Sequence, residues 1–267
     1  MSSARGAWIA MGCVVALVSM FLLMPSLLMA ISALSAGDVL NFPPEGVSLR
    51  WFLALLQNDE MRTALVNSFQ VSLICTLLSV LAGTPASVAL ARTSWKIKPV
   101  IELFLFLPFI IPAVVTAVGF LTVYGEADLI GRPWALGIAL SAFNLPFMMG
   151  AVMATVNRLD PNLEEAAASC GARPVERFLT VTLPAIMPGV VSGALLLFVL
   201  TFNEYVVSSF LVDVRSMTLP IEIFNQGRGV TSPIVAAASV LYLLISVVAI
   251  IGVDRLVGIE SVFRSEH

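Results

Sequence analysis

The 267-residue chain is 59% hydrophobic and 12% charged, whereas soluble domains average roughly 45–50% and 25%. These proportions indicate a protein that lies in a lipid bilayer. The formal net charge of −3 gives no sign of the basic surface that binds nucleic acid. The single histidine is His267, which argues against a histidine-ligated metal site and against a histidine-activated nucleophile.

Long uncharged stretches divide the chain, and six of them exceed the ~20 apolar residues that a helix needs to cross a bilayer. We predict membrane-spanning helices over residues 7–34, 65–91, 100–123, 134–156, 186–210 and 233–253. The first stretch is much longer than the apolar core of a secretory signal, about 7–15 residues, so we expect it to stay in the membrane. The expected fold is all-α, with residues 1–267 forming one transmembrane domain.

The basic residues predict the orientation of these spans. An even number of spans places both termini on one side, and cytoplasmic termini would put nine lysines and arginines inside and five outside. The nine are Arg5, Arg92, Lys96, Lys98, Arg158, Arg173, Arg177, Arg255 and Arg264. We therefore predict that both termini and the 157–185 loop are cytoplasmic.

Prolines and small residues recur inside the predicted spans. Kinks are expected at the prolines, namely Pro25, Pro85, Pro108, Pro112, Pro146 and Pro188. Small side chains that let helices approach closely follow one face of the second span and form a GxxxG in the fifth. They are Ser68, Ser72, Thr76, Ser79 and Gly83, and then Gly189 and Gly193. Both sets predict helix packing.

The 157–185 loop has the signals of a helix–turn–helix. Asp160 followed by Pro161 is a typical helix start, Gly171 permits a sharp turn, and Pro174 can begin a second short helix. The apolar face of that second helix would consist of Val175, Phe178 and Leu179. Such a face outside the membrane predicts a protein partner.

The same segment resembles the EAA loop of ABC importer permeases. That loop has Glu-Ala-Ala, a glycine four residues later, and nine further residues before an aliphatic-x-Leu-Pro end. The matching residues are Glu165, Ala166, Ala167, Gly171, Val181, Leu183 and Pro184. The resemblance implies a type I ABC importer permease fold with a loop that docks on a cytoplasmic ATPase. It assigns this coupling to Glu164, Glu165, Ala166, Ala167, Gly171, Ala172, Phe178, Leu183 and Pro184.

Four further motifs are similar to the spermidine/putrescine group of these permeases, and the chain length resembles the shorter of the group's two permease chains. They occupy residues 107–112, 144–147, 201–205 and 218–220. This resemblance implies a small cationic or amine-bearing cargo such as a polyamine. The group also includes permeases for opines, aminophosphonates and amino-acid-like solutes, which remain alternatives.

The resemblance also implies the assembly. The expected partners are a cytoplasmic ATPase dimer, a second and paralogous permease chain, and a solute-binding protein at the outer face of the bacterial inner membrane. The chain has no GxxxxGK[ST] phosphate loop, so ATP would be bound by the partner. No cofactor of its own is expected.

Glu204 is the only acid with long apolar sequence on both sides. On a continuous helix it would lie roughly 24 Å beyond Pro188, with Thr201 and Ser208 on the same face. Intramembrane carboxylates usually face a partner or a wet cavity. Two roles stay open, a cation-attracting group in the translocation path and an acid paired to another helix. The predicted substrate path comprises Thr201, Asn203, Glu204, Tyr205 and Ser208.

Other classes of function fit less well. An intramembrane enzyme would need paired acids, a metal cluster or a GxSxG nucleophile, and the predicted spans contain none of these. A stand-alone carrier would need ion-coupling acids, of which only Glu204 is available. A membrane scaffold leaves the EAA spacing unexplained.

Overall fold

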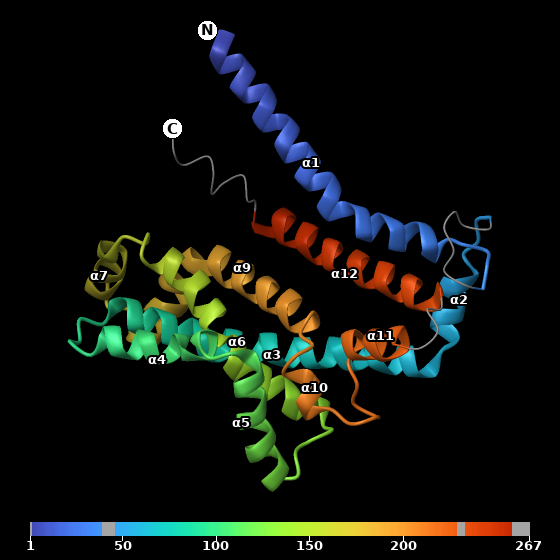
Figure 1. Ribbon diagram of the computed structural model, residues 1–267. Coiled ribbons are helices and arrows are strands. Elements are labelled where there is room, and N and C mark those ends of the chain that lie inside the picture. Colours follow the sequence, from blue (N-terminus) through green and yellow to red (C-terminus); the bar gives the residue numbers. More distant parts are fainter. Residues whose placement is uncertain (1, 39–45, 229–232, 258–267) are drawn as a thin grey trace. The chain divides into compact units, whose positions relative to one another are not determined.

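The computed structural model describes residues 2–38, 46–228 and 233–257, and within them every regular element is a helix (Figure 1). The long helices are α1 (Ser2–Ala33), α3 (Asp59–Arg92), α4 (Lys98–Ile110), α5 (Ala113–Glu126), α6 (Pro133–Val156), α9 (Leu183–Phe202) and α12 (Pro233–Val257). The short ones are α2 (Arg50–Gln57), α7 (Pro161–Ser169), α8 (Pro174–Arg177), the π-helical turn η1 (Phe178–Thr182), α10 (Ser208–Leu211) and α11 (Leu219–Gly227). The all-α prediction is confirmed, while Arg264 and His267 lie outside the described residues.

Four helices are long and apolar enough to cross a membrane. They are Met11–Ala33 in α1, α3, α6, and the continuous helix Pro174–Phe202 that contains α9. The bent pair α4–α5 would be a fifth span. At the sixth predicted position lies the 25-residue helix α12, of which the described apolar part, Pro233–Val248, is shorter than those four helices. The described residues therefore contain four or five spans, and the count of six stays a prediction.

The third predicted span, residues 100–123, is wrong as a single helix. The axes of Lys98–Pro108 and Ala113–Glu126 differ by 86°. Ile111 between them is extended, with φ −79° and ψ 132°, because a proline such as Pro112 disfavours the helical conformation of the preceding residue. The polypeptide therefore turns sharply here inside an apolar sequence.

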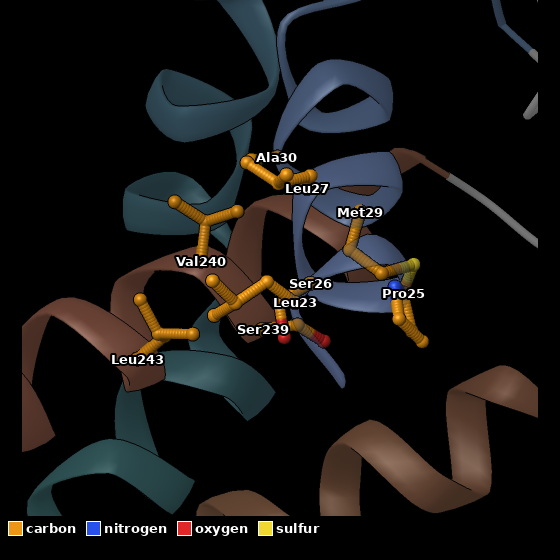
Figure 2. A pocket seen from close by; sticks show the side chains of 9 residues that line it. All are labelled: Leu23, Pro25, Ser26, Leu27, Met29, Ala30, Ser239, Val240 and Leu243. Carbon is orange, nitrogen blue, oxygen red and sulfur yellow. The ribbon is translucent and has the colours of Figure 1, made fainter. Parts of the chain in front are cut away.

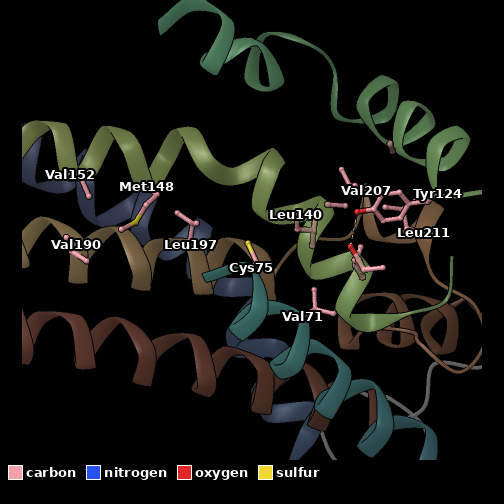
Figure 3. Close-up of a cluster of buried hydrophobic side chains, with 14 of the residues drawn as sticks. Val71, Cys75, Tyr124, Leu140, Met148, Val152, Val190, Leu197, Val207 and Leu211 are labelled. Carbon is pink, nitrogen blue, oxygen red and sulfur yellow. Dashed lines mark hydrogen bonds between the residues drawn. The ribbon is translucent and has the colours of Figure 1, made fainter. Parts of the chain in front are cut away.

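The described chain forms two compact units, residues 1–62 with 222–245 and residues 63–221 with 246 onward. The core of the second unit lies where α3, α6 and α9 meet, and it includes Cys75, Leu140, Met148 and Leu197 (Figure 3). The core of the first unit consists of Ala33, Ala236 and Ala237, against which Met29, Trp51, Phe52 and Val240 pack. The predicted single domain stays a prediction.

The GxxxG of α9 brings this helix close to α6. A Cβ added at Gly189 would lie 2.7 Å from Thr155 Cγ2 and 2.9 Å from the Ala151 carbonyl oxygen. A Cβ at Gly193 would lie 2.8 Å from Met148 Sδ. Only glycine fits such contacts, so the predicted role of this motif in helix packing is confirmed.

Candidate coupling loop and substrate path

The 157–185 loop folds as its local sequence predicts. Asp160 Oδ1 accepts a hydrogen bond of 3.0 Å from the Asn162 backbone N–H, and Pro161 is the first residue of α7. Gly171 turns the chain with a φ of +89°, and Pro174 then begins α8. The predicted helix–turn–helix is confirmed.

Four of the nine predicted coupling residues are exposed and the other five are partly buried. No residue of α7 or α8 is buried. Glu165, Ala166, Gly171 and Pro184 are exposed, whereas Ala167, Ala172, Phe178 and Leu183 are partly buried. Glu165 and Ala166 of the Glu-Ala-Ala sequence are therefore accessible to a partner.

The second half of the loop is continuous with the membrane-spanning helix that follows. The π-helical turn η1 joins α8 to α9, so that Pro174–Phe202 is one helix. Val175 and Leu179 on it are 70% and 53% exposed, and Leu163 on α7 is 50% exposed. Short π-helical segments inside helices are frequent at functional sites, and the sequence analysis did not predict this one.

Glu164 is the coupling residue that faces the body of the protein. Its Oε1 accepts hydrogen bonds from Arg92 Nη2 at 3.2 Å and from Thr182 Oγ1 at 3.0 Å. Arg92 lies in the last turn of α3 and Thr182 in η1. The sequence analysis missed Arg92 and Thr182, because no local spacing indicates a pair separated by 72 residues.

The predicted polar stripe along the fifth span is wrong, because α9 ends at Phe202. Glu204 instead lies in the turn before α10. Its Oε1 accepts from the Val207 backbone N–H at 2.7 Å, and its Oε2 accepts from the backbone N–H and Oγ of Ser208 at 2.8 and 2.7 Å. These donors offset the cost of placing a carboxylate among apolar residues. Glu204 thus caps the start of a helix on its own segment.

The side chain of Thr201 lies in the core of the second unit, while its carbonyl oxygen accepts a hydrogen bond of 3.1 Å from the Glu204 backbone N–H. The side chain is buried, accepts a hydrogen bond from Asn144 Nδ2 at 3.2 Å and donates one to Cys75 Sγ at 3.1 Å. These contacts connect α9 with α6 and α3, as polar side chains between membrane helices often do. Asn203 is exposed and Tyr205 partly buried. Their assignment to the substrate path stays a prediction.

The segment 212–218 beyond α10 is held against the start of α3. Asn67 Nδ2 donates to the backbone oxygens of Arg215 and Met217 at 3.1 and 3.0 Å. Ser68 Oγ accepts from the Leu219 N–H at 2.8 Å. Within the segment, the hydroxyl of Ser216 donates to Asp213 and lowers the pKa of this carboxyl group. The loop is therefore ordered by side chains that a helix pattern alone does not reveal.

A cavity of about 390 Å³ lies in the first unit (Figure 2). Its lining residues are Leu23, Pro25, Ser26, Leu27, Met29 and Ala30 of α1, with Ser239, Val240 and Leu243 of α12. All nine are uncharged, so this cavity lacks the carboxylate that an amine cation would need for binding. It does not coincide with the predicted substrate path.

These features define a helical membrane permease with an exposed loop for a partner. Residues 83–258 match the family model of the binding-protein-dependent transport system inner membrane component. The chain belongs to this family, the permeases of bacterial ABC importers. It is thus a multi-pass inner-membrane transport component and not an enzyme.

Several curated relatives are similar over most of the chain. The spermidine/putrescine permease protein PotC of Haemophilus influenzae is 30% identical over 75% of this chain and 78% of its own length. The putrescine permease protein PotI of Escherichia coli K12 is 29% identical, with coverages of 87% and 84%. The molybdenum permease protein ModB of Mycobacterium bovis is 31% identical, with coverages of 76% and 82%.

Solved structures show the same fold. A bacterial alginate ABC transporter, determined with its alginate-bound periplasmic protein, matches with a TM-score of 0.73 over 96% of both chains at 16% identity. The MetNI methionine ABC transporter matches with a TM-score of 0.64 over 79% of this chain and 98% of its own, at 18% identity. The importer permease fold implied by the EAA resemblance is confirmed.

Proposed function

We propose that this chain forms half of the translocation path for a small amine-bearing cation such as a polyamine. PotC and PotI carry spermidine or putrescine in their names, and the motifs at 201–205 and 218–220 resemble the same group. ModB is related at a similar identity, so overall identity alone does not select the cargo. The other half of the path is a paralogous permease chain, and a solute-binding protein delivers the cargo from outside.

The observation that supports ATP-driven transport is the exposed apolar surface of the 157–185 loop. Leu163 and Val175 are at least half exposed on α7 and α8, which bury none of their residues, and Leu179 of η1 is 53% exposed. Large apolar side chains left exposed on a loop outside the membrane favour an interaction site. In this family the matching partner is the cytoplasmic ATPase, with both chain termini on the same cytoplasmic side.

The predicted path residues have different roles in this proposal. Glu204, held by Val207 and Ser208, fixes the turn between α9 and α10. Asn203, whose amide donates to the Val199 carbonyl oxygen, and Tyr205 flank it as the predicted cargo contacts, while Thr201 keeps α9 joined to α6. The negative charge of Glu204 attracts a cation to this end of the path without direct contact.

Aspartate at Val175 tests the loop assignment. Val175→Asp places a charge in the proposed ATPase contact, and we expect the vanadate-sensitive ATP hydrolysis that co-purifies with the tagged chain to fall about tenfold or more, as for a central interface residue. Val214→Asp is the matched control, because Val214 is 85% exposed in a segment predicted to be extracytoplasmic. Equal ATP hydrolysis in both preparations would refute the loop as the docking site.

A further inference from the structure

The two helices of the coupling loop are attached to the membrane helices in different ways. α8 continues through η1 into α9 as one helix, so a force on α8 reaches α9 directly. α7 is separated from α8 by the turn at Gly171 and has no buried residue. Its attachment to the rest of the second unit therefore depends on few side chains.

Glu164 provides that attachment. Among the residues that the structure describes, it is the only α7 side chain that hydrogen-bonds to another element. A single carboxylate oxygen accepts from Arg92 at the end of α3 and from Thr182, which is buried in η1. Three elements thus meet at one atom.

The side chains of this ion pair are less exposed than those of the other described ion pairs. The side chains of Arg92 and Glu164 are 28% and 18% exposed, whereas those of the pair Arg62–Asp59 are mostly exposed. Partly buried charges are screened less by salt than exposed ones. Glu164 also lies in the first turn of α7 and Arg92 in the last turn of α3, where the helix dipoles stabilise these charges.

We propose that Arg92 is a positioning residue that makes α3 follow the coupling loop when the ATPase subunits close. Movement of the loop then reaches the core by two routes, through α8 into α9 and through Glu164 into α3. Both helices pack in the core that contains α6, so the two routes displace this core together. The inference rests on the proposed docking of the 157–185 loop on the ATPase.

A distance between spin labels on α3 and α7 tests this role without knowledge of the cargo. The labels are placed at Ala89→Cys and Ser169→Cys, both exposed positions, in a chain that also carries Cys13→Ser and Cys170→Ser. The assembled importer is measured without nucleotide and after trapping with ATP and vanadate. With Arg92 present we expect the same distance distribution in both states, because α3 and α7 move together.

Removal of the Arg92 guanidinium should uncouple the movement of α3 from that of α7. In Arg92→Ala we expect the distribution to shift or broaden on trapping, although the ATPase still co-purifies and hydrolyses ATP. Lys96→Ala removes an exposed charge just beyond α3 and should behave like the unchanged chain. The conservative variant Arg92→Lys keeps the charge at the end of α3 and should retain a constant distance.

Two results would overturn the role of Arg92. One is a constant distance in Arg92→Ala, and the other is loss of the ATPase from this variant, which would make the ion pair a requirement for folding of the loop. Failure of the unchanged chain to co-purify with any ATPase would instead refute the proposed function, and it is visible before any substitution is made.

Discussion

Gly171 shows how one residue sets the direction of a partner-binding loop. Its φ of +89° lies in the left-handed region, and a Cβ built on it meets no atom within 4 Å. A side chain at this position therefore has space but requires an unfavourable backbone conformation. Gly119 in α5 has equally open surroundings and an ordinary helical backbone, which makes it a matched control.

Alanine at these two glycines should have opposite effects. Gly171→Ala should strain the turn by about 1–2 kcal/mol, the cost of a left-handed non-glycine residue, and should re-aim α7 and α8. Gly119→Ala should stabilise α5 by about 0.5–1 kcal/mol. The measurement is ATP-driven uptake divided by the amount of co-purified ATPase. Only Gly171→Ala should reduce this ratio. Equal uptake in the two variants would show that the turn tolerates a side chain.

At this scale the sequence predicts capping and turn residues well and misses polar partners. Asp160 and Gly171 behave as predicted because their signals are local. The role of Glu204 could not be predicted, because it depends on where α9 ends. Only after that end can its carboxylate accept hydrogen bonds from the backbone N–H groups at the start of α10. Asn203, the C-cap of α9, is the one residue in this segment that could have indicated that helix end.

Among the described helices, α9 and α6 have the closest backbone approach at a glycine, which is Gly189. Gly189 faces Ala151 and Thr155 with no room for a methyl group, and backbone atoms there cannot move aside easily. Gly150 lies on α6 itself, and a Cβ there meets nothing within 4 Å. Gly189 and Gly150 both lie in α-helices and differ in how closely neighbouring atoms pack around them.

A methyl group at Gly189 should therefore destabilise the fold. Gly189→Ala should cost about 1–3 kcal/mol through overpacking, whereas Gly150→Ala should be neutral or stabilising. The measurement is the thermal unfolding midpoint of the purified chain in detergent. The pair Gly189→Ala with Thr155→Ala should recover part of the loss, because it removes the nearest side-chain atoms. An unchanged midpoint in Gly189→Ala would contradict the close packing of α6 and α9.

Prolines illustrate why the sequence predicts elements better than their shapes. Pro85, Pro146 and Pro188 lie inside continuous helices, whereas α4 and α5 separate before Pro112. A proline removes one hydrogen bond in either case. Whether the helix breaks depends on the neighbouring helices that replace this bond, and these neighbours are not visible in one segment of sequence.

For the whole molecule, the orientation in the membrane rests on the distribution of basic residues. We predict that Cys170, which is exposed in the 157–185 loop, is cytoplasmic. A membrane-impermeant thiol reagent should label it in inside-out vesicles and not in intact cells, with Cys13→Ser as the background. Labelling of Cys170 from outside intact cells would reverse the orientation and exclude contact with a cytoplasmic ATPase.

The class of the molecule could be predicted from the sequence because the EAA spacing is local and the apolar spans are long. The attachment of the loop could not, since Arg92 and Glu164 meet only after α3 and α7 are in place. The same holds for Asn67 and the 212–218 segment, which are joined across about 150 residues. Long-range polar contacts of this kind follow from the tertiary fold.

Uptake of radiolabelled putrescine by cells that carry the chain in place of its chromosomal copy tests the central claim most directly. We expect energy-dependent uptake that excess spermidine inhibits and molybdate does not. Val175→Asp should abolish it, while Val214→Asp, a similarly exposed position in the 212–218 segment, should leave it unchanged. Uptake that persists in Val175→Asp, or that molybdate inhibits and spermidine does not, would contradict a polyamine permease driven through the 157–185 loop.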